Sequence, residues 1–256
     1  MTNTQHQPLP SLGDRVLISP RYLAGIGADS LGNVIGPLTH LFDWHTTHDP
    51  ATGLVTLDSP DHCLFITFEP MRFDGVWWTI AHHEPNWEVK FTRQTPVEAI
   101  AAVTQALPQL LGDHRHCEQI PLTVGSPSSA AAGHQWTAHR DSNGFTSPDG
   151  HCTLRHTSQD PATWTVNASL YEGFDTEWSA VFTDAPERLV AQFVAGIASD
   201  IPVERAFGDI PYPVQHSTSA LITPIRGAAV NPHVHHAVAQ AAQACAPAPR
   251  RSPSTP

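Results

Sequence analysis

One short motif occurs twice in this chain, and the repeat limits what the sequence can fold into. Ser-Pro-Asp stands at 59–61, followed by His-Cys, and again at 147–149, followed by Gly-His-Cys. A reactive site needs such a motif once, whereas a duplicated architecture carries it in every copy. We therefore predict that the chain contains two related units.

The segments around each motif follow one another in the same order. In the second copy, segment 135–140 is a strand candidate, and apolar alternation predicts further strands at 164–171 and 176–183. Segments 76–83 and 87–92 match these two in the first copy. In both copies the last strand begins with Trp and carries Phe-Thr four residues later. An amphipathic helical pattern then follows, with Asp184 as the predicted N-cap in the second copy.

These patterns predict an α+β fold of two tandem β-β-β-β-α repeats. Four antiparallel strands with one apolar face need a cover, and the helix that follows them supplies it. We expect antiparallel sheets, each covered by a helix, in a pseudo-twofold arrangement. The expected parts are a disordered N-terminus at 1–13, a first repeat with a helical preface at 14–112, a linker at 113–133, a second repeat at 134–202, a C-terminal extension with a short helix at 203–242 and a disordered tail at 243–256.

Charge and composition narrow the function. The chain has 24 acidic and 13 basic residues, which gives a formal net charge of -11. This balance argues against strong, salt-dependent binding of duplex nucleic acid, because such binding depends on basic side chains that neutralise phosphates. The first residues carry no signal-peptide pattern, and no run of 18 apolar residues occurs. We therefore expect a cytoplasmic location and no membrane partner.

Taken together, the motifs resemble a known family. The stretch VLISPRYLAG at 16–25 precedes two copies of the Trp, Ser-Pro-Asp and helix pattern. This combination resembles the actinobacterial SPDY domain, domain-of-unknown-function family 317, in two tandem copies over about 14–202. The fourth letter of the motif differs, since His62 and Gly150 stand in its place. The resemblance implies no catalytic residues, because the family has no established activity.

The repeated motif itself has two readings. Asp61 and Asp149 could act as acids, and Cys63 and Cys152 as nucleophiles. The alternative is an ordinary turn, with Pro at its second position and Asp capping backbone amides. We favour the turn, because the motif is present twice. No motif of an enzyme class occurs in the chain, so we predict a protein that is not an enzyme and has no catalytic residue.

Histidine is abundant, with 17 residues, and the clusters at 113–117 and 233–236 look like metal ligands. A zinc site needs about four convergent ligands at structured spacings. The clusters fall in a predicted linker and at a predicted helix start, so we expect surface histidines, no metal and no cofactor. The four cysteines form no C-x-x-C pair.

The uncovered sheet face is the predicted binding surface. Trp77 adjoins Trp78 on one strand, so the two indoles should point to opposite faces. A polar sheet face with cations and aromatic rings is how several single-strand nucleic-acid binders stack bases. The candidate nucleic-acid-binding residues are Trp77, Lys90, Arg140, Arg155 and Asn167.

A second function is left open beside that one. A protein–protein scaffold or adaptor without nucleic-acid affinity suits the low charge equally well. The partner is therefore single-stranded nucleic acid or a protein. The sequence also leaves open whether the two copies pair within one chain or between the chains of a homodimer.

Overall fold

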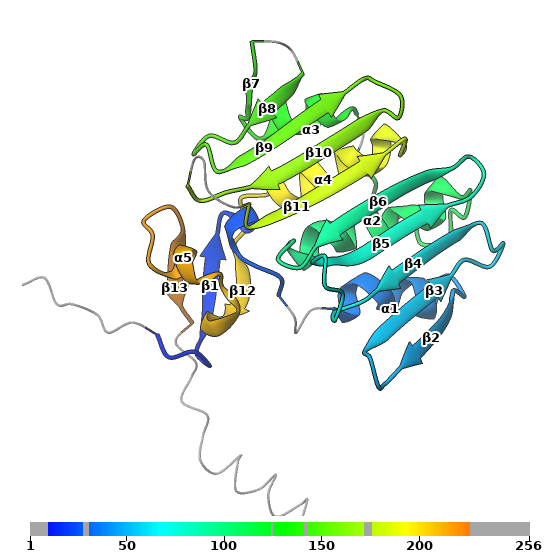
Figure 1. Cartoon of the computed structure of the whole chain (residues 1–256), viewed down its shortest axis with the longest axis horizontal. Helices are drawn as coiled ribbons and strands as arrows, with labels where there is room; N and C mark the ends of the chain where they lie inside the picture. Colours follow the sequence, from blue (N-terminus) through cyan, green and yellow to red (C-terminus); the bar gives the residue numbers. More distant parts are fainter. Residues whose placement is uncertain (1–9, 28–30, 124, 141–142, 172–175, 226–256) are drawn as a thin grey trace, which may run out of the picture.

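The computed structural model describes residues 10–27, 31–123, 125–140, 143–171 and 176–225. Ten of its strands form a single antiparallel sheet in the order β2-β3-β4-β5-β6-β11-β10-β9-β8-β7. A smaller three-stranded sheet, in the order β12-β1-β13, lies to one side of it (Figure 1). The expected class, α+β with antiparallel sheets, is therefore confirmed.

Each half of the large sheet comes from one continuous part of the chain. The first half contains β2 (His45–Asp49), β3 (Leu54–Asp58), β4 (Leu64–Phe68), β5 (Val76–His82) and β6 (Trp87–Thr92). The second half contains β7 (Thr137–Ala138), β8 (Gly144–Thr146), β9 (Cys152–Thr157), β10 (Thr163–Ala168) and β11 (Trp178–Thr183).

Two details of the expected repeat were wrong. Each half has five strands rather than four. In the second half the additional strand is β8, whose three residues are too few to show alternation in the sequence. The halves also form one sheet rather than two, since β6 and β11 pair along their edges. Phe91 lies opposite Ala180, and Phe182 lies opposite Val89.

Four helices cover one face of the large sheet (Figure 1). They are α1 (Gly32–Leu41), α2 (Val97–Leu110), α3 (Pro127–Gly133) and α4 (Glu187–Ala198). The helices α2 and α4 pack against each other, with α1 beside α2 and α3 beside α4. Gly196 allows this close contact, because a Cβ atom there would lie 3.1 Å from the Cβ of Ala102. In the described part of the chain, no helix is long and apolar enough to cross a membrane.

The helix α3 lies within residues 113–133, which the sequence assigned to a linker. Its local signals are clear in retrospect. The Ser126 side chain accepts a hydrogen bond from the Ser129 amide, and Pro127 stands at the first helical position. Seven residues are too few to show a helical period, so the run of Ser and Ala does not predict a helix from the sequence alone.

The core is continuous across the join between the halves. Phe193 of α4 stacks on Phe91 of β6 with ring centroids 5.4 Å apart, and it meets Phe182 of β11 at 5.5 Å. All three rings are fully buried. Aromatic pairs at such distances stabilise a core beyond the area that they bury.

The small sheet joins the two ends of the described chain. Its central strand β1 (Arg15–Ser19) pairs with β12 (Val203–Ala206) and with β13 (Leu221–Pro224). Between the last two lie η3 (Phe207–Asp209) and the short helix α5 (Tyr212–Gln215). This part of the predicted C-terminal extension is thus more regular than expected. Its predicted helix near 231–242 lies outside the described residues.

A buried ion pair fastens the small sheet to α2. Arg205 of β12 is 1% exposed, and its guanidinium binds both carboxylate oxygens of Glu98 at 2.8 and 2.6 Å. Gly27 passes directly over this guanidinium with φ +69, and a Cβ there would lie 2.6 Å from the Arg205 Cζ. Removing either partner would leave the other charge buried and unpaired, which is costly.

Candidate functional site

The two Ser-Pro-Asp turns share one hydrogen-bond pattern. Ser59 Oγ donates to Asp61 Oδ1, and Ser147 Oγ donates to Asp149 Oδ1, both over 2.6 Å. Each hydroxyl also accepts from the amide five residues further on, at 3.0 and 2.9 Å. Both serines are buried. The motif is thus the structural turn that the sequence favours.

The His-Cys pairs that follow the two motifs do not occupy equivalent positions, because Gly150 precedes the pair in the second copy. His62 and Gly150 occupy the same place, with φ 58 and 82, a left-handed conformation that glycine adopts freely. Cys152 therefore corresponds to Leu64 rather than to Cys63. Cys152 is fully buried, and burial raises the pKa of its thiol, which opposes a role as a nucleophile.

The aspartate of the first turn remains an acceptor. Hydrogen bonds from the Ser59 hydroxyl and the Cys63 amide lower the pKa of Asp61. Both hydrogen bonds are accepted by Oδ1, so this carboxylate holds the turn.

A segment near the start of the chain packs against the second half of the large sheet, beside its Ser-Pro-Asp turn. We call the region beside the Ser-Pro-Asp turn the end of each half. This Tyr22 segment, η1 (Arg21–Leu23), places Tyr22 edge-on to Trp136, with ring centroids 6.2 Å apart. The Tyr22 carbonyl accepts a hydrogen bond from Trp178 Nε1 at 2.8 Å. Burial, together with the neighbouring Asp149 of the second turn, raises the pKa of Tyr22. The tyrosine is 6% exposed, so it fills this place almost completely.

The arginine beside Tyr22 fixes the segment to the end of α4. Arg21 donates from Nε to the Ile201 carbonyl and from Nη1 to the Gly196 carbonyl, both at 3.0 Å. Carbonyls at a helix C-terminus attract cations, because they lack partners within the helix and carry partial negative charge.

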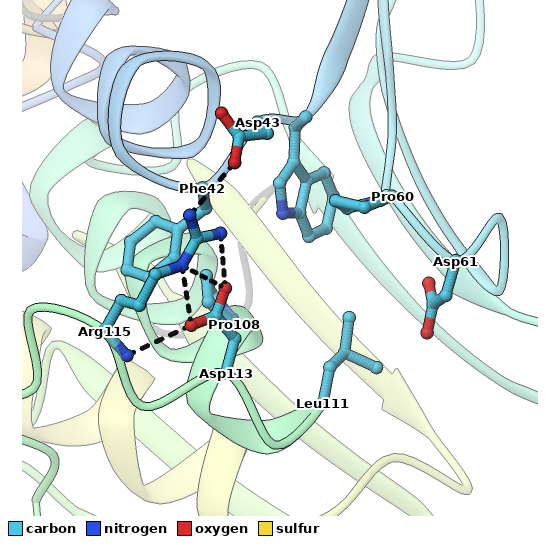
Figure 2. Close-up of a pocket in the computed structure, with 9 residues that line it drawn as sticks. Phe42, Asp43, Pro60, Asp61, Pro108, Leu111, Asp113 and Arg115 are labelled. Atoms are coloured by element: carbon cyan, nitrogen blue, oxygen red, sulfur yellow. Dashed lines mark hydrogen bonds and ion pairs between the residues drawn. The ribbon is translucent and has the colours of Figure 1, made fainter.

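The end of the first half carries an open cavity instead. Figure 2 shows the residues that line this cavity, which lies beside the first Ser-Pro-Asp turn. The volume of the cavity is about 240 Å³. It is lined by Phe42, Asp43, Trp44, Pro60, Asp61, Pro108, Leu111, Asp113 and Arg115.

The cavity lies beside Trp44 and Asp61 in the first half, as Tyr22 lies beside Trp136 and Asp149 in the second. Trp44 and Trp136 each follow a helix through one residue in the left-handed conformation, Asp43 or Gln135, with φ 60 and 62. Both tryptophans are 5% exposed. Each lies near the Ser-Pro-Asp turn of its own half.

The helix ends correspond as well. Leu111 caps the end of α2 and lines the cavity, and Ile201 follows the end of α4 and binds Arg21. Similar surroundings are thus filled by the Tyr22 segment in one half and open in the other.

The cavity lining carries a surplus of negative charge. Arg115 pairs with Asp43 at 3.0 Å and with Asp113 at 2.7 Å, as the dashed lines in Figure 2 show. This arginine lowers the pKa of Asp113 through its hydrogen bonds. With Asp61, the lining therefore carries three carboxylates and one guanidinium, and this surplus favours a ligand that brings a positive charge.

The structure brings some of the predicted nucleic-acid residues together. On the uncovered face, cross-strand pairing forms one row from Lys90 through Val181 and Thr165 to Arg155. At the usual strand spacing, Lys90 and Arg155 lie about 14 Å apart. Lys90 forms an ion pair of 2.5 Å with Glu88, so its charge is matched. Asn167 lies in the next row of the same face, opposite Ser179 on the neighbouring strand.

The other two predicted residues lie apart from this row. Trp77 stands at a bulge in β5 and packs edge-on against Phe68, with centroids 6.1 Å apart. It is half-buried, as are Lys90 and Thr165 of that row. Arg140 is exposed in the loop after β7, the strand at the outer end of the sheet.

Sequence reasoning missed the cavity residues. The available signal was the Trp that precedes each Ser-Pro-Asp turn, and the stretch SPRYLAG, which occurs once for two copies. The histidine cluster at 113–117 lies in the loop after α2 that supplies Arg115, and the cluster at 233–236 lies outside the described residues. No group of three or more His, Cys, Asp or Glu side chains within the described ranges is arranged to hold a metal ion.

The fold and its turns define a protein of the α+β class built on one extended antiparallel sheet. The family model of the SPDY domain, a domain of unknown function (DUF317), matches residues 58–109 and 146–203. The two matched segments are consistent with two tandem copies of this domain, and the resemblance seen in the sequence is confirmed. Each match starts at a Ser-Pro-Asp turn and runs into or past the covering helix. No curated protein and no solved structure gives a significant match.

Proposed function

We propose that this chain is a non-enzymatic adaptor whose first SPDY copy receives a segment of a partner protein. One observation carries the proposal. The Tyr22 segment fills the end of the second copy, whereas the corresponding end of the first copy is an open cavity of about 240 Å³.

The proposal includes a pseudo-twofold relation between the copies. Phe91 pairs with Ala180, and Phe182 pairs with Val89. Val89 stands two residues before Phe91, and Ala180 stands two residues before Phe182. Exchanging the halves maps these pairs onto each other, with Lys90 and Val181 at the centre. The two ends are then equivalent by architecture, and they differ only through the residues that occupy them.

A non-enzymatic role agrees with how the polar groups of the turns are used. Asp61 and Asp149 each accept a hydrogen bond from their own serine, and Cys152 is buried. These groups hold the backbone and are not assembled around a reacting atom.

Photo-crosslinking in the cells that produce the chain tests the adaptor role. A photoreactive amino acid at Pro60 would stand at the rim of the cavity, and one at Pro148 would stand at the equivalent turn beside the filled end. We expect a protein crosslinked from position 60 that is absent from position 148 and lost when Leu111→Arg blocks the cavity. The same crosslinks from both positions, or none from position 60, would contradict the proposal.

Single-stranded nucleic acid on the open sheet face is the second candidate. The exposed Arg155 and the polar row beside it favour it, whereas the Lys90–Glu88 pair and the packing of Trp77 weaken it. Fluorescence anisotropy with labelled single strands, at low and physiological salt, tests it. Salt-sensitive binding that Arg155→Ala reduces would favour this candidate. Arg188→Ala on the covered side is the matched control, since Arg188 is also exposed.

A further inference from the structure

We infer that the cavity of the first SPDY copy takes a tyrosine side chain that follows a basic residue in a partner protein. This inference rests on the adaptor function proposed above and names the chemistry of the segment. The template is within the molecule, since the second copy already holds an Arg-Tyr pair at the corresponding place.

The second copy shows what such a tyrosine meets. Tyr22 lies edge-on to Trp136, beside Asp149, and its carbonyl accepts from Trp178. Two of the matching groups in the first copy, Trp44 and Asp61, line the cavity. The third, Trp87, begins β6 as Trp178 begins β11, but it stacks on His82 with ring centroids 5.4 Å apart and is not part of the lining. An aromatic ring with a hydroxyl group can thus pack on the indole and donate to the carboxylate.

The size of the cavity agrees with a single side chain. Pockets for drug-sized ligands and cofactors usually measure about 300–1,000 Å³, and this one measures about 240 Å³. Its walls are apolar at Trp44, Pro60 and Leu111, whereas its polar groups lie at Asp61 and Asp113. A side chain with an apolar ring and one polar tip matches that distribution.

The negative charge of the cavity lining is the reason to expect a basic residue before the tyrosine. The lining carries three carboxylates, at 43, 61 and 113, and one guanidinium, Arg115, which pairs with Asp43 and Asp113 and leaves Asp61 unpaired with any cation of the lining. The end of α2 also adjoins the cavity through Leu111, as the end of α4 adjoins Arg21. A cation preceding the tyrosine would meet both the carboxylates and the helix terminus.

The occupant comes from another molecule. The chain has three tyrosines, and none of them lines the cavity. Tyr22 is already buried in the second copy. Tyr171, after β10, is 54% exposed, and Tyr212, on α5 beside the small sheet, is 73% exposed. A second copy of this chain that offers Tyr171 or Tyr212 is therefore the rival that the test must separate.

A peptide of residues 18–25, ISPRYLAG, is the probe, because it is the segment that fills the second copy. The full chain labelled with nitrogen-15 gives seven tryptophan indole signals, and Trp44→Phe identifies the one at the cavity. We expect the peptide to shift the Trp44 signal saturably and to leave the Trp136 signal, which Tyr22 covers, in place. The same peptide with Tyr22→Ala should lose the shift, and with Arg21→Glu it should bind about tenfold more weakly, or 1.4 kcal/mol.

Variants of the protein complete the test. Leu111→Arg fills the cavity and should abolish the shift. Leu221→Arg is the matched control, since Leu221 is 70% exposed on β13, far from the lining residues in sequence and absent from them. The remaining indole signals show that both variants are folded.

The outcomes separate the two proposals. If the peptide leaves the Trp44 signal unchanged at millimolar concentration while position 60 still crosslinks a partner, the tyrosine inference falls and the adaptor function stands. If neither result is obtained, both fall. A Trp44 signal that moves with protein concentration, and no longer does so in Tyr171→Ala or in Tyr212→Ala, would assign the cavity to a second copy of the chain and overturn the inference.

Discussion

In both Ser-Pro-Asp turns, the serine hydroxyl stabilises the turn through two hydrogen bonds. Each Ser Oγ donates to the aspartate two residues on and accepts from the amide five residues on. A hydroxyl can do both because it carries one donor and two acceptor sites. Alanine could do neither, and a buried backbone amide would then lack its partner.

The second turn should be sensitive to loss of its hydroxyl. Because Ser147 is 3% exposed, we expect Ser147→Ala to lower the free energy of unfolding by about 1–3 kcal/mol. Urea unfolding followed by tryptophan fluorescence measures the change. The control Ser158→Ala, at an exposed site, should stay within about 0.5 kcal/mol of the parent. Equal effects at both sites would refute this account of the turn.

Gly27 is required by both its conformation and its neighbour. A Cβ atom at φ +69 would meet the Arg205 guanidinium, which Glu98 holds in place. We expect Gly27→Ala to destabilise the fold by at least about 1–2 kcal/mol. Gly32→Ala should instead be neutral or slightly stabilising, since nothing lies within 4 Å there. Thermal melts of the two variants measure the change in stability. A Gly27→Ala variant as stable as the parent would contradict the packing described.

At the scale of elements, the edge between β6 and β11 makes one sheet out of two halves. The strands on both sides alternate strictly between buried and half-buried residues. Their buried rings meet α4 through Phe193, so strand pairing and helix packing support each other at the same place.

Truncation at this join should destabilise the whole molecule. We expect Phe182→Ala to cost about 3–5 kcal/mol, because Phe182 is fully buried among other rings. Guanidinium unfolding should still show a single transition, with coincident fluorescence and far-ultraviolet circular dichroism curves. Phe73→Ala is the control, since Phe73 is fully exposed. Two separated transitions would mean that the halves unfold independently.

At the scale of the whole molecule, carboxylates shape how stability depends on pH. Hydrogen bonds lower the pKa values of Asp49, Asp61 and Asp113. A carboxylate whose pKa is lowered by folding contributes stability above its unfolded value, and that contribution is lost as the pH falls through the folded value. Glu177 acts in the opposite sense, because burial raises its pKa and protonation relieves the cost.

The melting temperature should therefore fall below about pH 4, where unfolded aspartates begin to bind protons. Differential scanning calorimetry from pH 7 to pH 2.5 measures this dependence. Asp61→Asn should flatten it, since one of the shifted groups is removed. A melting temperature that stays level down to pH 3 would show that these hydrogen bonds contribute little.

The repeated motif, the α+β class and the turns could all be predicted without the structure. Apolar alternation located β10 and β11, helical spacing located α4, and six of the seven tryptophans are buried. These features follow from local rules, because periodicity reports which face of an element is buried. The bulge in β5 at Trp77 was not predicted, since it interrupts the alternation on which that rule depends.

What covers each buried face depends on contacts between distant parts of the chain. The tertiary structure joins β6 to β11, pairs β1 with two strands from the far end of the described chain, and sets the Tyr22 segment beside one half only. Trp178 and Tyr22 are 156 residues apart, and no local pattern encodes such a contact. The cavity at Trp44 likewise forms between segments from Phe42 to Arg115 that are distant in the sequence, so its lining could not be predicted from a local pattern.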